Sequence, residues 1–175
     1  MDARRNAERT ASLRLVTIDA VDFKEAMERA GRMLALRARS EREVRDRLRE
    51  AEFDDETIDA VVARLYELDL LNDEAFAVQL IEERATKKGL GPRMLLAELE
   101  AKGVDRATAE AALGIAGIDE ETQAVDQALK LVRKVINRPI KQQAAKLQQM
   151  LVRRGFSYEA AAAGVKAVLP PEGWD

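Results

Sequence analysis

The stretch LREAEFDDETIDAVV, residues 48–62, decides the fold because the chain repeats its pattern twice. The pattern returns as LEAKGVDRATAEAAL at 99–113 and as LVRRGFSYEAAAAGV at 151–165. In each copy, apolar residues take the first, sixth, eleventh and fifteenth positions, and another lies one helical turn earlier. These positions hold Val44, Leu48, Phe53, Ile58 and Val62; Leu95, Leu99, Val104, Ala109 and Leu113; and Leu147, Leu151, Phe156, Ala161 and Val165. Chance spacing is the alternative, but agreement at five positions in three copies favours a repeat of about 50 residues.

Helix start and stop signals surround each copy and predict three helices per repeat. In the first repeat they predict helices over 23–37, 41–51 and 55–68, opened by Asp22, Ser40 and Asp54. In the second they predict helices from Asn72 or Asp73 to Gly89, from Pro92 to Gly103, and from Asp105 to about Gly114. In the third they predict helices from Asp119 to Pro139, from Pro139 to Arg154, and from Ser157 to just before Pro170.

We therefore predict an all-α fold of three tandem three-helix repeats in an elongated or curved array. The predicted repeats cover 22–71, 72–118 and 119–170, with a flexible extension at 1–21 and a tail at 171–175. In each repeat, a short turn with a buried apolar residue (Phe53, Val104 or Phe156) joins two helices.

The composition agrees with a helical fold and narrows the chemistry. Alanine fills 30 of the 175 positions, and aromatic residues make up only 4%. The chain has no histidine and no cysteine, which excludes disulfides, thiol catalysis and the usual zinc ligand sets. No apolar run approaches the ~20 residues of a membrane span, and residues 1–20 lack a signal-peptide layout. We expect a cytoplasmic, monomeric protein with no cofactor, metal or catalytic residue.

Charge is distributed unevenly along the chain. Residues 51–80 hold nine acidic residues and one base, whereas residues 127–158 hold eight bases and no acid. The eight are Lys130, Arg133, Lys134, Arg138, Lys141, Lys146, Arg153 and Arg154. The spacing of four predicts that Lys130, Lys134 and Arg138 share one helix face, with Leu129, Val132, Val135 and Ile136 forming its apolar side. A solvated face explains some of these bases, but the lack of any carboxylate favours an anionic partner, either DNA or an acidic protein groove.

Other basic residues are weaker candidates for the same role. Arg42, Arg45 and Arg49 share a helical stripe, but neighbouring acids make a solvated face equally plausible. The segment 87–92, KKGLGP, has two glycines but no following Lys-Ser or Lys-Thr, so we interpret it as a helix stop and start, not a phosphate loop. The further partner-binding candidates are Arg39, Arg42, Arg45, Arg84, Lys87, Lys88 and Arg93.

Several segments together resemble one bacterial family. They are SEREV at 40–44, DLLNDEAFA at 69–77, Arg84, KGLGPR at 88–93, LEAKGVD at 99–105 and RGFSY at 154–158. In combination they resemble the RecX family of regulatory proteins, over about residues 30–169. Glu52 and Asp69 stand where that family usually has glycine, and Asn72 where it has aspartate. The turns at Glu52 and Asp69 must therefore close without glycine.

The resemblance implies a function. RecX-like proteins bind the RecA recombinase, above all its filament on single-stranded DNA, and inhibit its ATPase, strand exchange and coprotease activity. They are not known as enzymes, and direct contact with single-stranded DNA is left open here. One alternative is a helical DNA-binding module that acts without RecA. Another is an enzyme that uses carboxylates with Lys, Arg or a hard metal such as Mg²⁺.

Overall fold

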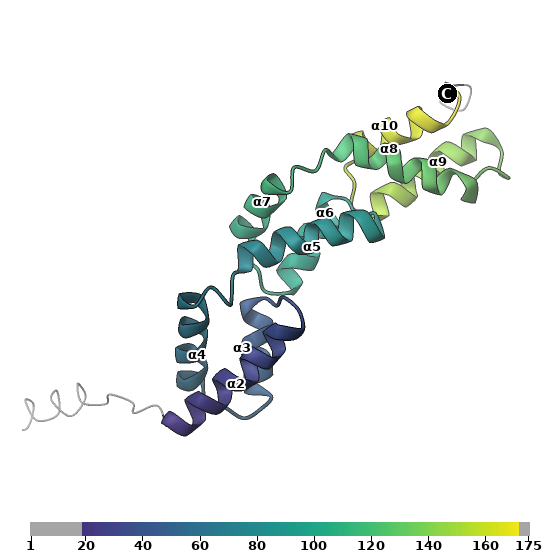
Figure 1. Cartoon of the computed structure of the whole chain (residues 1–175). Coiled ribbons are helices and arrows are strands. Elements are labelled where there is room, and N and C mark those ends of the chain that lie inside the picture. Colours follow the sequence, from purple (N-terminus) through teal and green to yellow (C-terminus); the bar gives the residue numbers. More distant parts are fainter. Residues whose placement is uncertain (1–18, 172–175) are drawn as a thin grey trace, which may run out of the picture. The chain divides into compact units, whose positions relative to one another are not determined.

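A computed structural model of the chain describes residues 19–171 (Figure 1). Most of the predicted extension at 1–21 and tail at 171–175 lies outside the described residues. Within residues 19–171 there are nine α-helices and no strand. The first three are α2 (Ala20–Leu36), α3 (Glu41–Arg49) and α4 (Asp55–Glu67). The next are α5 (Asp73–Lys88), α6 (Pro92–Ala101) and α7 (Arg106–Ile115). The last are α8 (Glu120–Leu131), α9 (Ile140–Arg153) and α10 (Tyr158–Val168), with a short 3₁₀ helix η1 (Val132–Lys134) after α8.

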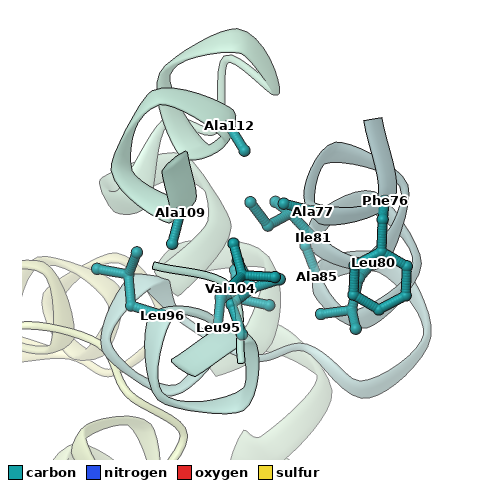
Figure 2. Packing of buried hydrophobic residues seen from close by; sticks show 11 residues of the cluster. Phe76, Ala77, Leu80, Ile81, Ala85, Leu95, Leu96, Val104, Ala109 and Ala112 are labelled. Atoms are coloured by element: carbon teal, nitrogen blue, oxygen red, sulfur yellow. The ribbon is translucent and has the colours of Figure 1, made fainter. Parts of the chain in front are cut away.

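The helices fall into three repeats of three, as predicted, and the chain divides after Asn72 into two compact units. The first unit holds the first repeat, and the second unit holds the other two. Each repeat has its own hydrophobic core. Figure 2 shows the core of the second repeat, one buried cluster to which α5 contributes Phe76 and Leu80 and α6 contributes Leu95. Every apolar position of the repeated pattern is buried, except Phe53 and Leu113, which are partly buried.

The repeated turn has the same hydrogen bonds in all three repeats. The amide of its apolar residue donates to a carbonyl five residues earlier, at 3.3, 3.1 and 3.3 Å for Phe53, Val104 and Phe156. This is the Schellman bond that closes a helix, and it requires the residue before the apolar one to be left-handed. Gly103 and Gly155 take that conformation at φ 84° and 96°, and Glu52 takes it at φ 66°.

A capping side chain then starts the next helix immediately after each turn. Asp54 and Asp105 accept hydrogen bonds from the amides of the residues three positions on, at 2.7 and 3.0 Å. Ser157 does the same in the third repeat, at 3.2 Å. Its own amide and hydroxyl donate to the Glu120 carboxylate of α8, at 2.6 and 3.1 Å. The pattern that identified the repeats is therefore a helix stop and a helix start in direct succession.

Two predicted helix ends were wrong. α2 begins at Ala20 and not at 23, because Asp19 caps it by accepting from the Val21 amide at 2.8 Å. Residues 19–21, predicted within the flexible extension, thus belong to the cap and first turn. α8 ends at Leu131, well before Pro139, and continues only as η1. Proline restricts the residue directly before it, here Arg138, so Pro139 does not account for an end at Leu131. The helix instead closes through the 3₁₀ turn of η1, as helix C-termini commonly do.

Candidate partner-binding surface

The basic residues of the third repeat are exposed and lack ionic partners. Six of the eight are exposed, whereas Lys146 and Arg154 are partly buried. Lys146 donates to Gln149 at 3.0 Å, and the buried Nε of Arg154 meets no acceptor in residues 19–171. None of the eight forms a salt bridge with another residue of the described part of the chain. Their charge is therefore available to a partner.

The early end of α8 corrects the predicted arrangement of these bases. Lys130 lies on α8, Lys134 in η1 and Arg138 in the following loop, so the three do not share one helix face. Gln143 of α9 holds that loop by donating to the Ile136 and Arg138 carbonyls, at 3.1 and 2.6 Å. The bases are thus carried on a helix end and an anchored loop.

The predicted apolar side of this segment is also only half correct. Val135 is 1% exposed and Val132 packs partly against the core, but Leu129 is 56% and Ile136 60% exposed. The core-facing side of this segment is marked by the buried residues Ala124, Ala128, Leu131 and Val135. Leu129 and Ile136 each follow a buried residue by one position, which turns them roughly 100° away from the core on a helix. The predicted apolar side was therefore one residue off at both positions.

Most arginines of the first repeat pair with its own acids. Arg42 pairs with Asp46 at 3.7 Å. Arg45 is partly buried and bridges Glu41 and Asp59, at 2.6 and 2.5 Å. Burial lowers the pKa of the Arg45 guanidinium, but its hydrogen bonds to the two carboxylates outweigh burial and raise that pKa above its usual value. Arg39 donates to the Met33 carbonyl at 3.5 Å. Of these candidates, Arg45 has a structural role.

Of the basic candidates in the second repeat, two form ion pairs with described residues and two do not. Arg84 is partly buried and pairs with Glu98 and Glu83, at 2.7 and 3.0 Å, and the hydrogen bond to Glu98 raises its pKa. Lys87 pairs with Glu83 at 3.4 Å, and its charge lowers the pKa of the Glu83 carboxyl. Lys88 and Arg93 are exposed and form no salt bridge within residues 19–171.

Two backbone hydrogen bonds join the start of α6, in the second repeat, to the end of α9, in the third; we call this contact the seam. The Gly91 amide donates to the Arg154 carbonyl at 2.8 Å, and the Arg93 amide donates to the Gly155 carbonyl at 3.1 Å. The amino end of α6 therefore meets the carboxyl end of α9, so their helix dipoles are joined favourably. A Cβ on Gly91 would lie 2.6 Å from the Phe156 nitrogen, so only glycine fits there. The helix stop and start read from the sequence is confirmed, but the sequence did not reveal its partner.

The described residues contain neither a candidate metal site nor a candidate membrane span. They contain no group of three or more Asp or Glu residues able to hold a metal ion. No helix among them is both long and apolar enough to cross a membrane. What residues 19–171 do present is three repeated helical domains, the third of which carries eight basic residues without an ionic partner in this range. The chain belongs to the class of tandem three-helix-domain proteins.

Comparison with known proteins identifies the family. Three family models match the chain: the first, second and third three-helix domains of RecX match residues 26–65, 72–113 and 119–163. The chain belongs to the RecX family, as its sequence segments predicted.

Named relatives and solved structures agree with this assignment. The chain is 36% identical to the "Regulatory protein RecX" of Bacillus velezensis over 149 residues, covering 83% of the chain and 56% of the relative. Against that of Amycolatopsis mediterranei it is 35% identical, covering 84% and 85%. The chain thus spans little more than half the length of the Bacillus relatives. The crystal structure of RecX from Lactobacillus salivarius aligns at a TM-score of 0.77 and 26% identity, covering 84% of this chain and 96% of that one. The names of these relatives support a regulatory role.

Proposed function

We propose that the protein binds a RecA recombinase filament on single-stranded DNA and inhibits its ATPase, strand exchange and coprotease activity. Family membership and the regulatory names of its relatives support this role. The observation that carries the proposal is the set of third-repeat bases that have no ionic partner within residues 19–171. Three domains in series can contact successive protomers, and such linked contacts raise avidity without strong individual contacts. The basic residues predicted from the sequence remain candidates for contact with the filament. Arg45 and Arg84 are the exceptions, because they form ion pairs within the protein.

The first experiment is the single-stranded-DNA-dependent ATPase of a RecA recombinase, with and without this protein. We expect inhibition at well below one regulator per recombinase protomer, because blocked growth or disassembly of a filament affects many protomers. An unaffected ATPase at every ratio would contradict the proposal.

A charge reversal tests the third-repeat surface. Lys130→Glu/Lys134→Glu/Arg138→Glu should abolish inhibition without loss of helicity, because all three side chains are exposed. The matched control reverses Arg32, Arg47 and Arg64 of the first repeat, which are exposed and already paired at the surface. The control should inhibit as the wild type does. Equal loss of inhibition in both variants would show a general effect of net charge.

A DNA-binding module that acts without a recombinase is the second candidate, favoured by the same unpaired bases. It predicts tight binding to bare DNA at physiological salt. If about four phosphates of a single strand are neutralised, log affinity falls with log salt at a slope of roughly −3. Salt-independent binding would contradict phosphate contacts.

A further inference from the structure

Two exposed aliphatic side chains stand among the unpaired bases of α8 and η1. Leu129 is 56% and Ile136 60% exposed, and Lys130, Arg133 and Lys134 are exposed beside them in the sequence. We call Leu129, Lys130, Arg133 and Ile136 the α8–η1 face. The residues between them that point inward are Leu131 and Val135, at 3% and 1% exposure. Scattered exposed leucines are ordinary in proteins, but two on one charged face form a specific surface.

These four side chains lie within eight residues at the carboxyl end of α8. Leu129 and Lys130 belong to the last turn of α8, Arg133 to η1, and Ile136 to the turn that follows η1. Residues three or four apart are neighbours on a helix, which places Arg133 beside Leu129 and Lys130, and Ile136 extends the exposed segment beyond η1. The nearest preceding acid, Asp126, lies one turn before Lys130 and forms no salt bridge within the described chain. From Lys130 onward the face is therefore basic and partly apolar.

The exposure of Ile136 is held in place by the fold. Its carbonyl accepts a hydrogen bond from the Gln143 side chain of α9, which also binds the Arg138 carbonyl. The following loop is thus tied to α9 on both sides of Asn137. The isoleucine is presented outward on an anchored turn, which lowers the entropy lost when a partner covers it.

We propose that the α8–η1 face docks an acidic segment of a protein partner that carries apolar side chains, and not the backbone of a nucleic acid. The two unpaired cations of this face, Lys130 and Arg133, complement carboxylates, and Leu129 and Ile136 complement aliphatic groups. Phosphates offer no partner to aliphatic side chains, and unpaired bases are bound by stacking on aromatic rings, which this face lacks. The proposal rests on the proposed function for the partner's identity, but its chemistry can be tested without a recombinase.

Fluorescence anisotropy with the full chain tests it, using three labelled probes. The first is a helical peptide with glutamates and leucines on one face, and the second has the same charge with serine in place of each leucine. The third is an oligo-dT strand. We expect the leucine peptide to bind about ten-fold more tightly than the serine peptide, since two half-exposed aliphatic side chains become covered.

Leu129→Ser/Ile136→Ser should remove that preference and leave oligo-dT binding unchanged. Val21→Ser/Leu36→Ser is the matched control, because those side chains are 70% and 83% exposed in the first repeat. Should the first variant fold poorly by circular dichroism, Lys130→Glu/Arg133→Glu provides the test and should weaken binding of both peptides. Equal affinity of the wild type for the two peptides, a leucine preference that survives Leu129→Ser/Ile136→Ser, or peptide binding that is unchanged in Lys130→Glu/Arg133→Glu overturns the proposal. Concentration-dependent dimerisation lost in Leu129→Ser/Ile136→Ser would also overturn it, by assigning the face to a second copy.

The test separates this inference from the proposed function. Uninhibited recombinase together with a leucine preference would refute the filament role and retain the acidic, apolar partner. Inhibited recombinase together with equal peptide affinities would retain the filament role and refute the acidic, apolar partner of this face.

Discussion

The first and third repeats build the same helix–turn–helix and use charge in opposite ways. Seven arginines of the first repeat form salt bridges with its own carboxylates. The eight bases at 127–158 form none with any residue of 19–171. The repeats also differ at their turns, since Glu52 stands where the third repeat has Gly155. The comparison teaches that a shared backbone motif fixes the fold, whereas charge pairing decides which repeat has a surface left for a partner.

The largest expected effect is at the glycine of the third turn. Gly155→Ala should destabilise the second unit by roughly 2–4 kcal/mol, because the residue is left-handed and its Cβ would overlap the Met94 nitrogen. Hydrogen exchange should show faster exchange at the Gly91 and Arg93 amides. Gly31→Ala in the first repeat is the control, since nothing lies within 4 Å of the added carbon and about 0.5–1 kcal/mol is gained. Unchanged exchange at the seam in Gly155→Ala would contradict this account.

Next comes the contrast between a paired and an unpaired base. Arg45→Ala should cost about 1–2 kcal/mol of stability, because it leaves two carboxylates without their shared guanidinium. Arg133→Ala in the third repeat should change stability by less than about 0.5 kcal/mol. Urea denaturation followed by circular dichroism measures both. Equal costs would show that pairing does not distinguish the two repeats.

A smaller effect of opposite sign is expected at the first turn. Glu52→Gly should stabilise the first unit by about 1 kcal/mol, because glycine adopts the left-handed conformation without strain. Asp69→Gly should gain less, since aspartate tolerates φ 53° better than glutamate tolerates φ 66°. Thermal melting of both variants ranks them. A loss of stability in Glu52→Gly would mean that the glutamate side chain makes a contact that offsets its strain.

The smallest expected effect is a loss of helix-cap stability at low pH. The Thr57 amide, by hydrogen bonding, holds the pKa of the Asp54 carboxyl below its ordinary 3.8. A lowered folded pKa means that the cap stabilises α4 above about pH 3.8 and is lost as pH falls further, through the folded value. Asp54→Ser, which copies the cap of the third repeat, should remove that dependence. Carboxyl and Thr57 amide NMR shifts across an acid titration check it. An unaltered amide titration in the variant would exclude Asp54 as its cause.

Local signals in the sequence were sufficient for most of the fold. Capping residues and turn spacing depend on neighbours within a few positions, so Ser40, Asp54, Asp105 and Ser157 marked their helices correctly. Gly103 and Gly155 likewise marked two helix ends. Asp19 was missed because Asp22 and Glu25 offered a competing capping pattern three residues later.

The candidate surface was harder to predict, because it depends on contacts between distant residues. Nothing near Arg45 in the sequence shows that Asp59 reaches it across the turn. Hydrophobic periodicity likewise does not report the early end of α8, or the two hydrogen bonds by which Gln143 holds the loop that carries Ile136 and Arg138. Gly91 was read as a helix start, and the reason that it must be glycine lies more than sixty residues further on.

The seam between α6 and α9 limits the independence of these domains. Three similar units in a row suggest interchangeable parts that could be gained or lost singly during evolution. The Gly91 and Arg93 amides, however, find their acceptors only at the carboxyl end of α9. Loss of the third domain would leave two amides at the start of α6, in the second domain, without their acceptors. Duplication of the third domain would create a second carboxyl end of α9 with no α6 to accept from. We therefore expect the second and third domains to be retained together.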